Sequence, residues 1–178
     1  AIAGFRERIV ATQEKLARTL TEEVGKPIRQ SRNELTGLLG RIDFFLQESA
    51  RALREEKVYA DGSKMDERIT HEPLGVVANI SAWNYPYFVG SNVFVPALVA
   101  GNAVLYKPSE FATLTGLAIA DMLHEAGVPR DVFVPVVGDG ATGAALTRQP
   151  VDGIFFTGSY ATGKRIAASA GQRMVKVQ

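Results

Sequence analysis

Polar residues that could bind a nucleotide follow directly after several apolar runs of this chain. The group after the run at 153–156 consists of Gly158, Ser159, Thr162 and Gly163. A helix that begins at such a turn presents backbone N–H groups outward, and these suit a phosphate. We predict that Ser159 hydrogen-bonds a pyrophosphate oxygen and that Phe156 and Thr162 belong to the same site. The alternative is a plain turn between strand and helix.

The two glycines of this turn have separate expected roles. Gly158 would permit an unusual backbone angle. Gly163 lies inside the expected helix, where glycine costs about 1 kcal/mol relative to alanine. Such a cost indicates close packing of the helix on the strand.

A second group, Lys107, Pro108, Ser109 and Glu110, follows the run at 103–106, and we predict that all four belong to the cofactor site. Lys107 could neutralise a phosphate or hydrogen-bond a ribose, and the Glu110 carboxylate could accept from two vicinal ribose hydroxyls. An acidic residue at the end of a second strand is the usual reader of an unphosphorylated ribose. The alternative is that Pro108, Ser109 and Glu110 only cap the helix expected from Thr113.

A third group follows the run at 74–80 and consists of Ser81, Ala82, Trp83 and Asn84, with Ile80 as the last residue of the run. Trp83 would form an aromatic wall. The Asn84 amide could donate a hydrogen bond to a developing oxyanion. The alternative is that Asn84 only shapes its turn.

A glycine-rich stretch at 138–143 has the spacing G-x-G-x-x-G after a further apolar run. The acidic residue that a dinucleotide fingerprint places about 20 residues later is not evident. We therefore expect a tight turn at Gly140 and Gly143 that lets an adenine lie close to the backbone, rather than the main phosphate loop.

Composition excludes several other chemistries. The chain has 178 residues, a formal net charge of +1 and no cysteine, so it contains no disulfide, thiolate metal site or cysteine nucleophile. His71 and His124 lack partners at metal-ligand spacing, so no metal site is expected. The balanced charge predicts neither nucleic acid nor membrane as partner. We expect a cytoplasmic protein, because the sequence shows neither a signal peptide nor an apolar run long enough to span a membrane.

The pattern of elements predicts an α/β fold. Amphipathic helices are expected at 2–24 and 28–56, the second with a solvated charged face, and a hairpin at 57–73 around Asp61-Gly62-Ser63. Strands are expected at 74–80, 103–106, 132–137, 153–156 and 175–177, and helices at 87–100, 113–126, 141–148 and 162–170. Alternating buried strands and helices indicate a doubly wound, mainly parallel, Rossmann-like sheet with helices on both faces.

Ligands of such sheets bind beyond the carboxyl ends of the strands. The polar groups after the strands should therefore surround one crevice, in which a dinucleotide lies across the sheet. Asn84, Lys107, Glu110 and Ser159 must lie around this crevice if the interpretation is right.

Taken together, these residues resemble the aldehyde dehydrogenase superfamily over essentially the whole chain. The segments that carry the resemblance are Glu23-Val24-Gly25-Lys26-Pro27, His71-Glu72-Pro73-Leu74-Gly75-Val76-Val77, Trp83-Asn84-Tyr85-Pro86, Pro96-Ala97-Leu98-Val99-Ala100-Gly101-Asn102, Lys107-Pro108-Ser109-Glu110 and Phe156-Thr157-Gly158-Ser159 with Gly163. The resemblance implies oxidation of an aldehyde to a carboxylic acid with NAD(P)⁺, through a cysteine thiohemiacetal and a thioester. Glu110 favours NAD⁺, because a carboxylate repels a 2′-phosphate, with NADP⁺ as the alternative.

The resemblance also implies residue roles. Asn84 matches the oxyanion donor, Lys107 and Glu110 the adenosine-ribose contacts, and Ser159 the pyrophosphate contact. Trp83 and the backbone of 80–82 match the wall along the dinucleotide. The expected substrate tunnel consists of Tyr85, Phe88, Val89 and Asn92. Residues 57–73 match the first hairpin of an oligomerisation domain, which implies a dimer or tetramer.

One departure concerns the family's nucleophilic cysteine and glutamate base, which match no residue of this chain. We therefore expect residues 1–56 and 74–178 to be an NAD(P)-binding domain truncated at both ends, without its catalytic domain and inactive alone. One alternative is a CoA-acylating aldehyde dehydrogenase, which would lack the glutamate base in its downstream sequence. The other is a non-catalytic nucleotide-binding module.

Overall fold

The computed structural model describes residues 1–62 and 64–178, and its centre is a parallel sheet. The five strands of this sheet are β3 (Val76–Ile80), β4 (Ala103–Lys107), β5 (Phe133–Pro135), β6 (Gly153–Phe156) and β7 (Lys176–Val177). Their spatial order is β5-β4-β3-β6-β7, and every neighbouring pair is parallel. The predicted parallel sheet is confirmed, with strands shorter than expected at 74–80 and 132–137.

The strand order reverses at β3. The chain adds β4 and β5 on one side, then crosses back to place β6 and β7 on the other. Ile80 at the end of β3 pairs with Lys107 on β4 and with Phe156 on β6. The carboxyl ends of these three strands therefore meet at the switch point, where doubly wound sheets bind ligands.

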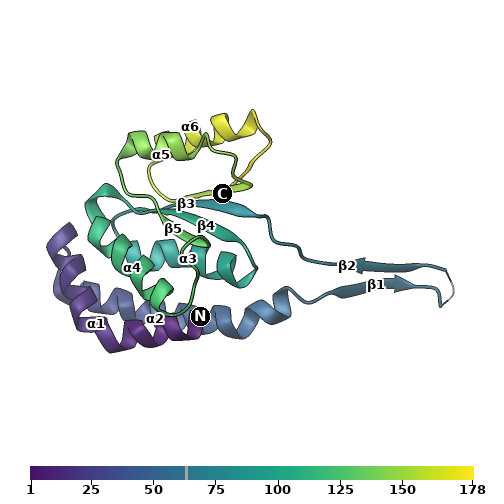
Figure 1. The fold of residues 1–178 in the computed structure, drawn as a ribbon, viewed down its shortest axis with the longest axis horizontal. Helices are drawn as coiled ribbons and strands as arrows, with labels where there is room; N and C mark the ends of the chain where they lie inside the picture. Colours follow the sequence, from purple (N-terminus) through teal and green to yellow (C-terminus); the bar gives the residue numbers. More distant parts are fainter. Residues whose placement is uncertain (63) are drawn as a thin grey trace.

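Helices cover both faces of the sheet (Figure 1). α3 (Pro86–Val99) and α4 (Thr113–Glu125) pack on one face, while α5 (Gly140–Leu146) and α6 (Tyr160–Gly171) lie on the other. Each face has its own apolar core, and the smaller one joins Ile80, Ile154 and Ile166 under α5 and α6. This arrangement confirms the predicted double winding.

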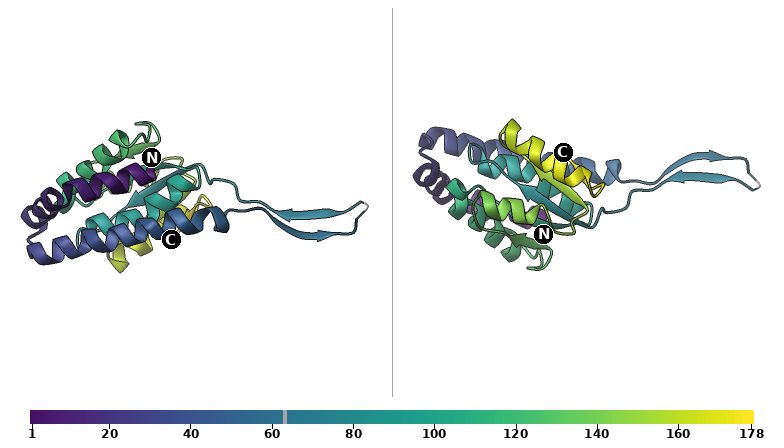
Figure 2. Two further views of the ribbon diagram at one scale, coloured as in Figure 1. Left: turned by 90° about the horizontal axis from the view of Figure 1, so that it is seen from below. Right: turned by 90° about the horizontal axis from the view of Figure 1, so that it is seen from above.

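α1 (Ile2–Val24) and α2 (Ile28–Ala52) form an outer layer behind α3 and α4 (Figure 2). α1 ends where expected, because Gly25 adopts a left-handed conformation with φ 70°. α2 ends at Ala52 rather than at the predicted Glu56, because Glu56 already pairs with Ile69 in the hairpin. Among the described residues, no helix combines the length and apolarity needed to cross a membrane.

An aromatic cluster fixes α3 to the sheet and to α1. The fully buried ring of Phe94 makes edge contacts with Phe5, Tyr106 and Phe133, at centroid distances of 6.1, 5.5 and 5.3 Å. These rings come from α1, α3, β4 and β5. The cluster therefore holds together four elements that are remote in sequence.

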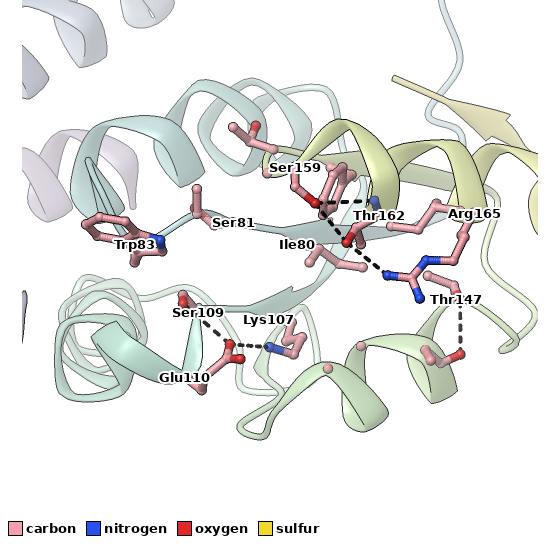
Figure 3. A pocket seen from close by; sticks show the side chains of 18 of the residues that line it. Ile80, Ser81, Trp83, Lys107, Ser109, Glu110, Thr147, Ser159, Thr162 and Arg165 are labelled. Atoms are coloured by element: carbon pink, nitrogen blue, oxygen red, sulfur yellow. Dashed lines mark hydrogen bonds and ion pairs between the residues drawn. The ribbon is translucent and has the colours of Figure 1, made fainter.

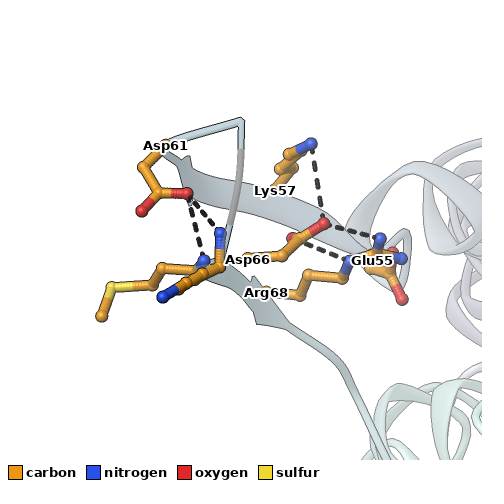
Figure 4. A network of polar contacts seen from close by, with 7 residues as sticks. Glu55, Lys57, Asp61, Asp66 and Arg68 are labelled. Atoms are coloured by element: carbon orange, nitrogen blue, oxygen red, sulfur yellow. Dashed lines mark hydrogen bonds and ion pairs between the residues drawn. The ribbon is translucent and has the colours of Figure 1, made fainter.

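The hairpin consists of β1 (Glu56–Ala60) and β2 (Asp66–Ile69) and projects away from the rest of the molecule (Figure 1). All residues of both strands are exposed. Arg68 bridges Asp66 and Glu55, and Lys57 lies 3.6 Å from Asp66 (Figure 4). Asp61 accepts hydrogen bonds from Lys64 N and Met65 N, as predicted for a turn here, although Ser63 lies outside the described residues.

Candidate functional site

A cavity of about 870 Å³ opens at the carboxyl ends of β3, β4 and β6 (Figure 3). It contains Asn84, Lys107, Glu110 and Ser159, which the sequence predicted to surround one crevice. The other predicted residues that line it are Ile80, Ser81, Ala82, Trp83, Ser109, Gly140, Gly143, Phe156, Gly158 and Thr162. Its size lies in the range of pockets for small organic ligands, about 300–1,000 Å³.

The β4 side of the cavity carries a buried cation beside a partly exposed carboxylate. Lys107 is 3% exposed. Its Nζ donates to Pro108 O at 3.0 Å and lies 3.8 Å from Glu110 Oε2. Burial lowers the pKa of Lys107, although the carboxylates of Glu110 and Asp139 act in the opposite direction. Both a donor and an acceptor therefore face the cavity at one point, as a ribose with two hydroxyls requires.

Ser109 and Pro108 have structural roles in the same turn. The Ser109 hydroxyl accepts from Phe111 N and caps the 3₁₀ helix η1 (Glu110–Ala112), so the capping alternative holds for this residue. Pro108 does not line the cavity. It packs against Gly116, where an added Cβ would come within 2.5 Å of the proline ring. Pro108 therefore supports the turn from behind.

The β6 side of the cavity is the N-terminus of α6. Ser159 Oγ accepts from Thr162 N at 3.3 Å and lies 3.0 Å from Thr162 Oγ1 (Figure 3). Arg165 donates to Thr162 Oγ1 at 3.3 Å and adds a cation to this wall. A neutral serine cap therefore stands beside a guanidinium at the start of a helix, which suits an anionic group.

The glycines at this turn serve close packing. Gly158 is not in the left-handed region, contrary to the expected unusual angle; instead, a Cβ there would lie 2.5 Å from the Phe156 ring. Gly163 does not line the cavity. It packs against Phe156, with 3.4 Å between the position of a Cβ and the ring, as the sequence predicted for helix-on-strand packing.

The glycine-rich turn before α5 offers little to a phosphate. Asp139 caps this helix and accepts from Ala141 N and Thr142 N. Its carboxylate thus occupies the N–H groups that an anion would need. Gly143 faces Lys107, since a Cβ there would lie 3.4 Å from Lys107 Cδ and Cε.

The β3 side carries Trp83 and Asn84. Ser81 N donates to Lys107 O at 3.0 Å, which joins the turn after β3 to the end of β4. Trp83 is 51% exposed. The Asn84 side chain makes no hydrogen bond within the described part of the chain, so the structure gives it no turn-shaping contact.

Several lining residues were not predicted as site residues. They are Phe111, Ala144, Thr147, Arg148, Thr157, Arg165, Ile166 and Ser169. Six of these eight residues lie on or just after α5 and on α6, and one face of a helix repeats every three or four positions. Repeated steps of that size from Gly140, Gly143 and Thr162 would have found these six, but not Phe111 or Thr157.

The four residues predicted for a substrate tunnel line two cavities. Tyr85 and Phe88 border a shallow cavity of about 260 Å³ beside Glu34 and Gly37 on α2. Val89 and Asn92 line a cavity of about 570 Å³ at the other side of α3. Phe156 and Thr157 line both this second cavity and the large one.

Comparison with known proteins places this geometry in a family. The model of the aldehyde dehydrogenase family matches residues 2–178. The chain is 35% identical over 161 residues to the N-succinylglutamate 5-semialdehyde dehydrogenase of Sphingopyxis alaskensis, covering 89% of this chain and 33% of that protein. It thus spans about a third of the length of such curated relatives.

Solved structures show the same fold. The NAD-dependent aldehyde dehydrogenase of Sinorhizobium meliloti superposes with a TM-score of 0.93 at 34% identity, over 99% of this chain and 35% of that one. A double mutant of Staphylococcus aureus betaine aldehyde dehydrogenase, in complex with NAD⁺, gives 0.92 at 28% identity, over 99% and 36% of the two chains. On these matches, the chain belongs to the aldehyde dehydrogenase family.

Proposed function

We propose that this chain is the cofactor-binding part of an enzyme that oxidises an aldehyde to a carboxylic acid with NAD⁺, with NADP⁺ as the alternative cofactor. The observation that carries the proposal is the convergence of Asn84, Lys107, Glu110 and Ser159 on one cavity. Family membership supports aldehyde oxidation in general. The nucleophilic cysteine and the glutamate base come from sequence outside these 178 residues, which contain no cysteine.

The lining of the cavity offers contacts for a ribose, a diphosphate and a base. Lys107 and Glu110 hold a ribose, and Ser159 with the first turn of α6 holds the diphosphate. The base lies between α5 and α6, where Ala144 and Ile166 supply apolar surface and Arg165 supplies a guanidinium that can stack on a base. The cofactor supplies a hydride acceptor.

Asn84 lines the cavity and follows Trp83 in the chain, and Figure 3 shows Trp83 at the opposite end of the site from Arg165. The Asn84 side chain has no competing hydrogen-bond partner in the described residues. An amide N–H held there stabilises the oxygen of an aldehyde as negative charge develops on it. This is the catalytic contribution of the chain.

The hairpin formed by residues 57–73 is proposed to mediate self-association, as a dimer or a tetramer. An isolated two-stranded hairpin is marginal in water. Val58, Tyr59 and Ile69 are each about half exposed, at 57%, 49% and 49%. Their burial against another copy would stabilise the hairpin.

Replacing Glu110 by alanine in the full-length protein should raise the KM for NAD⁺ about 10-fold, because two charge-assisted hydrogen bonds to a ribose are lost. The KM for NADP⁺ should stay constant or fall, since the repulsion of a 2′-phosphate is removed. Steady-state kinetics with both cofactors measures this. Glu22→Ala, at an exposed position on α1, is the control. An unchanged KM for NAD⁺ would show that Glu110 does not bind the ribose.

NAD⁺ affinity should also weaken at alkaline pH, starting below the pH at which an ordinary lysine titrates. Burial lowers the pKa of Lys107, so its charge is lost early and the affinity falls about fivefold. Between the lowered pKa and the ordinary one, the unfolded state binds more protons at Lys107, so the contribution of this residue to folding stability rises with pH. Calorimetric titrations of wild type and Lys107→Met measure it; the variant should show no such pH dependence.

A further inference from the structure

A buried carboxylate from α2 caps the helix that follows Asn84. The Glu34 side chain is 0% exposed, and its Oε1 accepts from Tyr87 N at 2.8 Å and from Phe88 N at 3.1 Å. These are N–H groups of the first turn of α3, which otherwise lacks a side-chain cap. Glu34 therefore fixes the start of α3 from a position 53 residues earlier in the chain.

Lys26 completes this arrangement from the turn between α1 and α2. Its side chain is 8% exposed, and its Nζ donates to Glu34 Oε2 at 2.5 Å. The same Nζ lies 3.6 Å from the centroid of the Tyr85 ring, within the range of a cation–π contact. Lys26 thus holds both the capping carboxylate and the residue directly after Asn84.

This pair is poorly explained as a source of stability. Burial raises the pKa of Glu34, although Lys26 and the two backbone N–H groups act in the opposite direction. Desolvation of the carboxylate therefore outweighs its favourable contacts, as is common for buried ion pairs. What the pair does supply is a fixed geometry for the backbone on both sides of Pro86.

The link from this pair to Asn84 is short and stiff. Asn84 is separated from Tyr87 N only by Tyr85 and Pro86, and the proline ring restricts φ. The Asn84 side chain has no hydrogen bond of its own in the described residues, so within them its place in the cavity depends on its backbone alone. A shift of the first turn of α3 or of Tyr85 is therefore transmitted to Asn84.

We propose that Lys26 and Glu34 are positioning residues that aim the amide of Asn84 at the reacting oxygen. The inference rests on the oxyanion role proposed for Asn84. A displacement of about 1 Å in a catalytic group can cost 10²-fold in rate, so loss of the pair should be visible in kcat.

The test is a double-mutant cycle in the full-length enzyme. Glu34→Gln should lower kcat about 10- to 100-fold and leave the Kd for NAD⁺ within about twofold. In an Asn84→Ala background, Glu34→Gln should change kcat by less than about twofold, since the group it positions is gone. Lys26→Gln keeps a hydrogen-bond donor but loses the charge, and it should show the same pattern of kcat values. It replaces Glu34→Gln as the test variant if Glu34→Gln does not fold.

A matched control is offered by Glu23, a carboxylate on α1 that caps α4 through Leu114 N, Thr115 N and Thr115 Oγ1 at 2.6, 2.7 and 2.7 Å. Glu23→Gln should lower the melting temperature and leave kcat at saturating cofactor unchanged. An equal loss of kcat in this variant would show that any lost helix cap has the same effect, and would overturn the inference.

The outcomes separate this inference from the proposed function. If Asn84→Ala lowers kcat while Glu34→Gln and Lys26→Gln do not, only the positioning role is wrong. If Glu34→Gln lowers kcat by the same factor with and without Asn84, the pair acts independently of Asn84 and the inference is overturned. If Asn84→Ala has no effect, the oxyanion role and the inference both fail.

Discussion

Asn84→Ala in the full-length enzyme is expected to reduce kcat for aldehyde oxidation about 10²- to 10³-fold, which is the effect of removing one oxyanion donor. The Kd for NAD⁺ should not change, because Lys107, Glu110 and Ser159, the proposed cofactor contacts, lie at other walls of the cavity. Steady-state kinetics together with calorimetric titration of NAD⁺ measures both quantities.

A second variant at this position sharpens the result. Asn84→Asp keeps the size of the side chain, but an ionised carboxylate cannot donate a hydrogen bond and repels the developing negative charge. Its kcat should be at least as low as that of Asn84→Ala. An increase in KM at constant kcat in either variant would assign Asn84 to substrate binding instead of transition-state stabilisation.

The largest loss of stability is expected for Phe94→Ala, at about 3–5 kcal/mol. The Phe94 ring is fully buried and contacts Phe5, Tyr106 and Phe133, so its removal leaves a cavity between α1, α3 and the sheet. Because these three neighbours belong to three separate packed elements, α1, β4 and β5, they cannot collapse to fill the space. Amide hydrogen exchange in β4 and β5 of the full-length protein measures the effect locally.

Phe44→Ala is the control for this prediction, since Phe44 is also an aromatic residue on a helix but is 49% exposed. Its effect should be below about 1 kcal/mol, because much of its surface is in water in the folded state as well. Equal exchange rates in the Phe94 and Phe44 variants would contradict the role of the cluster.

The fold could be predicted from sequence because its signals are local. Each buried strand is a short apolar run, each helix has its own periodicity, and the left-handed Gly25 ends α1 at the expected place. The positions of Asn84, Lys107, Glu110 and Ser159 at one cavity follow from the same pattern, since parallel strands bring their carboxyl ends together. Their roles in binding and catalysis stay predictions.

The long-range polar contacts could not be predicted. Glu34 belongs to a charged stretch of α2 that the sequence assigned to a solvated face, and it is buried instead. Its hydrogen-bond partners on α3 are 53 and 54 residues away in the chain. Glu23 likewise reaches the start of α4, 91 residues later, only after the chain has folded. The four predicted tunnel residues also line two different cavities, Tyr85 and Phe88 one and Val89 and Asn92 the other. This separation depends on how α3 is rotated against α2.

Phe156 and Thr157 form a partition between two chambers, because they line both the large cavity and the neighbouring one beside α3. Gly158 and Gly163 press against the same ring from the α6 side, so the ring has little room to yield. A molecule in either chamber therefore meets the same fixed wall, and one phenylalanine bounds both chambers.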